Sequence, residues 1–169
     1  MTPDRALMLH VLRHALLGVR DGGRVIAEFT DGPGPDALEP DIGRRLADIM
    51  LALVNLPPLG LHWRIIDRDR AREVVAMVLH EDLETEATRI PRKVAYNMAD
   101  RVLAAFDDVH QREGADAPNL LYFTNIKPDA DLSQSPHKWA SGRVEAELDA
   151  GVAIVGADLI GLVWVEDRP

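Results

Sequence analysis

The sequence predicts an α+β fold, an antiparallel or mixed sheet of about four to five strands covered by N-terminal helices in a two-layer sandwich. Two observations predict this class. Apolar residues recur at helical spacing through most of residues 1–112, whereas the later part shows the short alternating or fully apolar runs typical of strands. With 169 residues, 47% of them hydrophobic, and no repeat or long linker, we expect one domain, 1–169.

The first predicted helix spans residues 3–20, because Pro3 is tolerated in a first turn and Asp21-Gly22-Gly23 stops the helix. Residues 24–30, R-V-I-A-E-F-T, are rich in β-forming residues and bounded by glycines, so they predict a strand. The apolar face predicted for the helix contains Met8, Leu9, Val11, Leu12, Ala15, Leu16 and Val19.

A second helix is predicted from Pro40 to Asn55, because Pro57-Pro58 just after it would stop a helix. Residues 62–66 predict a short strand. The expected buried stripe of this helix is Ile42, Leu46, Ile49, Met50 and Leu53.

Two further helices follow. Asp67 is the expected N-cap of a helix that continues to about Leu83, and Pro91 suits the first turn of a helix that continues to about Val109. The short link predicts that they form an antiparallel pair. Their predicted buried residues are Ala71, Val74, Val75, Val78 and Leu79 in the first, and Val94, Met98, Val102 and Phe106 in the second.

The last part of the chain predicts strands joined by turns. Gly-Ala-Asp at 156–158 is the expected hairpin turn, and Gly151 is either a break or a bulge within one long strand. The final apolar run, L-I-G-L-V-W-V, is typical of a central strand, and Glu166 and Asp167 are expected at its solvated end, where they could extend an acidic patch. The predicted strands are 120–125, 144–149, 152–155 and 159–166.

Residues 143–149, R-V-E-A-E-L-D, alternate between apolar and acidic side chains. Successive side chains of a strand point to opposite faces, so one face joins the core and the other is acidic. We call the acidic side chains, Glu145, Glu147 and Asp149, the acidic stripe. It is either a solvated sheet face or a surface that binds a basic partner.

Residues 127–143 form the best candidate for a binding loop. Segments of this length without periodicity are uncommon in compact domains and often bind ligands or partners. Trp139 is a natural interface anchor, and Asp129, Asp131 and His137 add polar groups beside it. The alternative is a covering loop whose Trp139 lies in the core.

Charge and composition narrow the class of function. The net charge is -9; residues 1–112 hold 15 Lys/Arg and 18 Asp/Glu, and residues 113–169 hold 4 and 10. The last third therefore carries -6 and lacks the basic cluster that nucleic acid requires. The absence of cysteine excludes disulfides and thiolate metal sites. Without a signal-peptide core or a membrane span, we expect a soluble cytoplasmic protein.

Two segments that contain histidine superficially resemble metal-binding motifs. His10 and His14 are one helical turn apart, but no acidic ligand lies on the same face one turn away, so packing is favoured. Residues 78–86, V-L-H-E-D-L-E-T-E, partly match the zinc-binding motif H-E-x-x-H, but Glu84 stands where the motif needs its second histidine. We therefore expect His80 and Glu84 to form an exposed ion pair instead of a metal site. The sequence thus predicts no metal site and no cofactor.

The leading hypothesis is a protein-interaction module resembling an immunity protein or antitoxin, which binds a basic toxin or enzyme and occludes it. The alternative is a small hydrolase or transferase with a His/carboxylate pocket formed by residues 127–143 and the strand ends. A third possibility is a structural subunit with a broad apolar interface. The predicted partner-binding residues are Asp129, Asp131, His137, Trp139, Glu145, Glu147, Asp149, Glu166 and Asp167.

Overall fold

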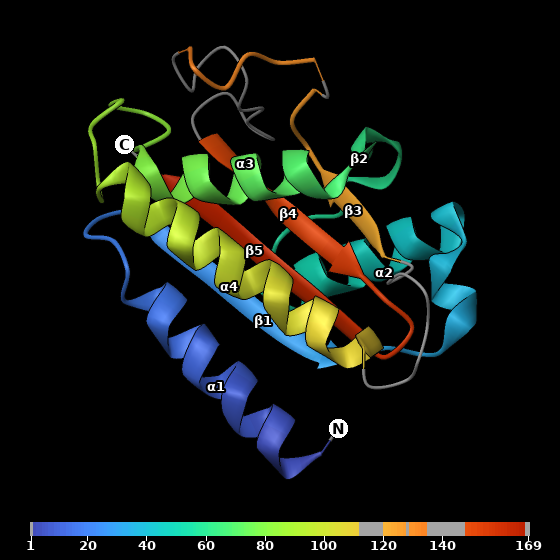
Figure 1. Cartoon of the computed structure of the whole chain (residues 1–169). Helices are drawn as coiled ribbons and strands as arrows, with labels where there is room; N and C mark the ends of the chain where they lie inside the picture. Colours follow the sequence, from blue (N-terminus) through green and yellow to red (C-terminus); the bar gives the residue numbers. More distant parts are fainter. Residues whose placement is uncertain (1, 112–119, 128, 135–147, 168–169) are drawn as a thin grey trace.

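The computed structural model describes residues 2–111, 120–127, 129–134 and 148–167. These residues form an antiparallel sheet flanked by helices (Figure 1), so the predicted α+β class is confirmed. The helices are α1 (Pro3–Leu17), α2 (Pro40–Leu53), α3 (Arg68–His80) and α4 (Arg92–Gln111), with short 3-10 helices η1 (Pro35–Leu38) and η2 (Gly60–His62). The strands are β1 (Arg24–Asp31), β2 (Arg64–Ile66), β3 (Leu121–Thr124), β4 (Leu148–Val155) and β5 (Leu159–Asp167).

The five strands lie in the order β1-β5-β4-β3-β2, and every neighbouring pair is antiparallel. β5 therefore occupies the interior position that its apolar sequence predicts. β4 and β5 form a hairpin whose turn is residues 156–158, closed by a 2.9 Å hydrogen bond from Gly156 N to the carbonyl of Leu159. Gly151 pairs in register with Trp164, so it lies within one regular strand and marks no break.

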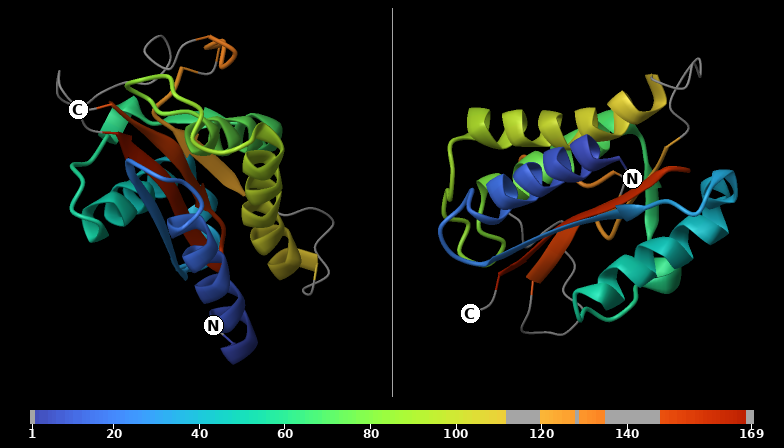
Figure 2. Two further views of the ribbon diagram at one scale, coloured as in Figure 1. Left: turned by 90° about the vertical axis from the view of Figure 1, so that its left-hand side faces the viewer. Right: turned by 90° about the horizontal axis from the view of Figure 1, so that it is seen from below.

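Helices cover both faces of the sheet. α1, α3 and α4 lie on one face and α2 lies on the other (Figure 2). The side chains of β5 alternate accordingly: Val163 and Val165 join the core beneath α3 and α4, and Leu162 and Trp164 join the core beneath α2. This arrangement adds a third layer to the expected two. It explains why β5 is apolar on both sides, since neither face of the strand meets water.

The buried side of α2 differs from the predicted stripe. Met50 is buried as expected, but Ile49 and Leu53 are 54% and 65% exposed. The helix instead faces the sheet with Gly43 and Ala47, and a Cβ at Gly43 would lie 2.8 Å from Cζ of Phe123. Close approach of the helix to the sheet explains the difference, because only the smallest residues fit at this contact.

α1 is also less buried than its sequence predicts. Leu9, Leu12 and Leu16 contact the core, whereas Met8 and Val11 are 37% and 52% exposed. The helix lies at one margin of the molecule, beside β1 and α4 (Figure 1). It therefore buries one apolar face and leaves a second one open.

α3 and α4 form the predicted pair, and Asp67 caps α3 by accepting a 2.7 Å hydrogen bond from Arg70 N. α3 ends at His80, earlier than predicted, because the following residues form a loop closed by the Glu81–Thr88 bridge. The expected His80–Glu84 pair on one helical turn is therefore wrong. The His80 ring instead places Nδ1 2.7 Å from the carbonyl oxygen of Ile90.

The described parts of the chain contain no helix whose length and hydrophobicity would let it cross a membrane.

Close contact between β4 and β5 leads to a stability prediction. A Cβ at Gly151 would lie 2.2 Å from the carbonyl oxygen of Val163 and 2.7 Å from Trp164 Cα. We expect Gly151→Ala to lower the free energy of unfolding by about 1–3 kcal/mol, as overpacking in a core does. The control is Gly18→Ala, where the nearest atom to the new Cβ is 3.6 Å away and φ is -100°. Urea unfolding that shows equal stabilities for the two variants would contradict this packing account.

Candidate partner-binding site

The structure places the predicted partner-binding residues in two different environments. Asp129 and Asp131 are exposed on the loop after β3. Asp149, Glu166 and Asp167 are buried, at 4%, 4% and 2% exposure. The other four predicted residues, His137, Trp139, Glu145 and Glu147, lie outside the described residues.

Residues 129–134 form a turn that Asp131 organises; we call it the acidic turn. The Asp131 carboxylate accepts hydrogen bonds from Ser133 N at 3.0 Å, Ser133 Oγ at 2.6 Å and Gln134 Nε2 at 3.0 Å. These bonds, chiefly the one from the Ser133 hydroxyl, lower the pKa of Asp131. The exposed Asp131 carboxylate therefore stays ionised to a more acidic pH than an ordinary aspartate does.

Two contacts attach the acidic turn to the rest of the fold. Leu132 is buried in the core beneath α3 and α4. The guanidinium of Arg70, on α3, donates a hydrogen bond to the carbonyl of Ala130. The acidic turn is thus held by an apolar anchor and a charged donor, and its carboxylates point away from the core.

A cleft of about 210 Å³ separates the acidic turn from α3 and α4. Its walls carry charges of both signs: Arg70 pairs with Glu73 at 3.0 Å, and Arg92 lies over the Tyr96 ring at 5.7 Å from the centroid. Small-molecule pockets are typically about 300–1,000 Å³, so this cleft suits one or two side chains of a partner better than a whole ligand. The lining residues are Arg70, Glu73, Met77, Arg92, Tyr96 and Ala130 to Ser133.

Asp149 and Glu166 lie directly opposite each other on β4 and β5. Two facing carboxylates repel, and each has a compensating donor. Trp164 Nε1 donates to Asp149 at 3.1 Å, and Arg24 pairs with Glu166 at 2.9 Å. The expectation that Glu166 lies at a solvated strand end is therefore wrong, because an arginine of the neighbouring strand β1 covers it.

Asp149 has the orientation that alternation predicts but not the exposure. Leu148 packs toward α3 and α4, so Asp149 points to the opposite face of the sheet. The structure buries Asp149 because β4 is an interior strand and helix α2 covers that face. This residue of the acidic stripe is not a solvated charge.

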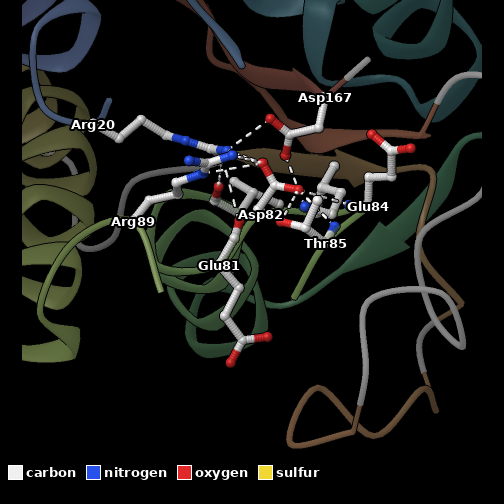
Figure 3. Close-up of polar contacts among 9 residues, drawn as sticks. Arg20, Glu81, Asp82, Glu84, Thr85, Arg89 and Asp167 are labelled. Atoms are coloured by element: carbon white, nitrogen blue, oxygen red, sulfur yellow. Dashed lines mark hydrogen bonds and ion pairs between the residues drawn. The ribbon is translucent and has the colours of Figure 1, made fainter. Parts of the chain in front are cut away.

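Asp167 belongs to a buried ion cluster at the end of β5 (Figure 3). Its Oδ1 accepts from Arg20 Nη2 at 2.7 Å, and its Oδ2 accepts from Leu83 N at 2.7 Å. Arg20, whose side chain is fully buried, also donates to the carbonyl of Val78 at 2.7 Å. The expected solvated position of Asp167 is thus wrong as well, since the carboxylate joins β5 to the segments before β1 and after α3.

Asp82 completes the ion cluster from the loop after α3. Burial alone would raise the pKa of Asp82, but hydrogen bonds from the backbone of Thr85 and from Arg89, together with the charge of Arg89, lower it to about 2. The Thr85 amide and hydroxyl donate to Asp82 at 2.7 and 2.9 Å, and Arg89 Nε donates at 3.0 Å. Figure 3 shows the guanidinium groups of Arg20 and Arg89 together beside the two carboxylates.

Sequence reasoning did not select Arg20, Asp82 or Arg89. One local signal was available: an aspartate in a short polar segment favours a turn in which its carboxylate accepts hydrogen bonds from the backbone that follows, as Asp82 does from Glu84 N at 3.1 Å. No local pattern indicates Arg20, because its partner Asp167 is 147 residues away in the chain.

The described residues contain no group of three or more His, Asp or Glu side chains that could hold a metal ion. The rings of His10 and His14 contact each other edge to face, with centroids 4.4 Å apart. Comparisons with protein-family models, with curated proteins and with solved structures found no match.

The low pKa of Asp82 predicts a specific acid sensitivity. Its folded pKa of about 2 lies below the ordinary 3.8, so its stabilisation is present above pH 4 and disappears as the pH falls toward 2. The shift corresponds to about 2 kcal/mol. We expect Asp82→Asn to lose this contribution, so that its stability changes less than that of the wild type between pH 4 and pH 2.

Urea unfolding at several pH values checks this prediction. The control is Asp36→Asn, which changes an exposed aspartate and should leave the wild-type pH dependence intact. An Asp82→Asn variant that loses stability as steeply as the wild type below pH 4 would show that the ion cluster does not determine the acid response.

Proposed function

We propose that this chain is a protein-interaction module that binds a basic protein and occludes its active surface, as an immunity protein or antitoxin does. The observation that carries the proposal is the acidic turn, where hydrogen bonds hold the exposed carboxylate of Asp131, a buried leucine anchors the backbone, and Asp129 is exposed two residues earlier. A surface ordered before binding loses less conformational entropy on association, so its charges contribute more to affinity.

The charge of the whole chain supports the same class of partner. A net charge of -9 attracts basic proteins over a long range and raises their rate of association. Asp131 lines the cleft and Asp129 is exposed two residues before it, so these two carboxylates would make the first contacts. The cleft beside them would accept one or two side chains of the partner.

The predicted residues divide into two roles. Asp149, Glu166 and Asp167 are hydrogen-bonded within the fold, so we assign them to holding the strand ends in position. Asp129 and Asp131 are assigned to direct contact. The contact roles proposed for His137, Trp139, Glu145 and Glu147 rest on the sequence alone, with Trp139 as the anchor.

Charge changes in the acidic turn test the proposal. In the double variant Asp129→Lys/Asp131→Asn, the asparagine Oδ1 can still accept the two hydrogen bonds from Ser133, while the charge changes by three units. Affinity capture from lysate of the source cells should yield one stoichiometric basic protein with the wild type, retained at low salt and released at high salt. We expect the variant to associate with that protein about tenfold more slowly at low salt.

The matched control is Asp36→Lys/Glu39→Gln, which changes the net charge equally at exposed positions before α2. Equal binding by the two double variants would remove the acidic turn from the interface. A basic partner whose own activity is unaffected by the wild-type chain would contradict occlusion.

The hydrolase or transferase alternative has one specific observation in its favour. Asp149 and Glu166 form a cross-strand pair of carboxylates, the kind of pair that acid and base catalysis uses. Both carboxylates accept hydrogen bonds from Trp164 or Arg24, which favours a structural role. Assay of the full chain against chromogenic esters, with Glu166→Gln as the comparison, checks this alternative.

A further inference from the structure

The helix α1 carries apolar side chains on two faces but buries only one. Leu9, Leu12 and Leu16 contact the core. On the other side Leu7 is 63% exposed and Val11 52%, and Met8 lies beside them at 37%. Exposed apolar residues gathered on one surface often mark a site of contact with another molecule, so the second apolar face calls for an additional contact.

The open face of α1 borders a groove of about 320 Å³ between α1 and α4. Met8, Val11 and Leu12 line it from α1, and the small residues Ala104 and Ala105 line it from α4. The surface therefore combines an apolar ridge with an apolar hollow beside it. Such a shape can receive a copy of its own ridge.

Charges of opposite sign flank this surface. Asp4 shares a helix face with Met8 and Val11, because the three residues are spaced by four and three. Arg101 lines the groove from α4, and its guanidinium donates only to the sulfur of Met98 within the described residues. One chain thus offers both members of a possible ion pair.

From these features we propose that the α1–α4 face binds a second copy of this chain in a two-fold symmetric dimer. A two-fold axis near Met8, with the two α1 helices antiparallel, places Asp4 of one copy level with Leu12 of the other. Arg101 lines the groove at this level, so each copy contributes one aspartate and one arginine. Val11 then packs between Asp4 and Met8 of the second copy.

Local charge favours a second copy over a basic partner at this face. α1 contains Asp4 against Arg5 and Arg13, a local net charge of +1 on a chain of net charge -9. A basic protein is therefore attracted to other parts of the surface. A second copy meets here a helix that is not negatively charged, so the negative net charge of the two chains opposes this contact less than it would elsewhere.

Sedimentation equilibrium of the full chain from roughly 1 µM to 1 mM measures the dimer, a range that covers weak and moderate affinities. We expect a concentration-dependent dimer for the wild type. Val11→Asp should weaken it by at least about tenfold, because a charge would replace a central apolar contact. The matched control is Leu53→Asp, an exposed leucine of α2, which should dimerise as the wild type does.

A charge exchange tests the proposed pair directly. Arg101→Asp alone and Asp4→Arg alone should each weaken the dimer, since like charges then face each other. Combined in one chain, the two changes should restore it, and a merely structural effect of either would not be restored. Circular dichroism shows whether each variant is folded.

Three outcomes would overturn the proposal. The first is a wild type that is monomeric throughout the concentration range. The second is a dimer equally sensitive to Leu53→Asp and Val11→Asp, and the third is a double variant no better than its single variants. None of these outcomes bears on the binding of a basic partner through Asp129 and Asp131.

Discussion

The buried guanidinium of Arg20 is the interaction on which the architecture most depends. It binds Asp167 at the end of β5 and the carbonyl of Val78 near the end of α3, while Arg20 itself lies just before β1. A charge inside a protein is tolerated only with close partners of opposite charge, so these three segments must meet in one geometry. The Asp167 carboxylate lies so close to the backbone of Gly23 that a side chain has no space there: a Cβ would lie 1.8 Å from Asp167 Oδ1.

Periodicity predicted the elements well because strands and helices bury side chains at fixed intervals. The regions of the four α-helices in the described residues and the central position of β5 followed from apolar spacing, and Asp67 was recognised as a cap from its position. The buried face of α2 was not predictable in this way. Small residues can face a sheet more closely than large ones, and hydrophobicity alone ranks Ile49 above Gly43 although the helix turns Gly43 inward.

The candidate site was only partly predictable for a related reason. Exposed polar residues on an aperiodic loop are recognisable from sequence, which is how Asp129 and Asp131 were identified. Burial of a carboxylate depends instead on which distant donors the fold brings to it. Arg24 reaches Glu166 across a gap of 142 residues, and no local pattern distinguishes that pair from a solvated strand end.

The position of β5 also has a consequence for how the chain acquires its fold. β1 pairs only with β5 in the described sheet, so its hydrogen-bonding partner is synthesised more than a hundred residues later. Until then the inner faces of β1 and α1 lack much of their apolar cover. Pairing across such a separation makes folding slow, because a long loop must close before contacts compensate for its entropy. In a nascent chain the edge of β1 would therefore stay unpaired until β5 has left the ribosome.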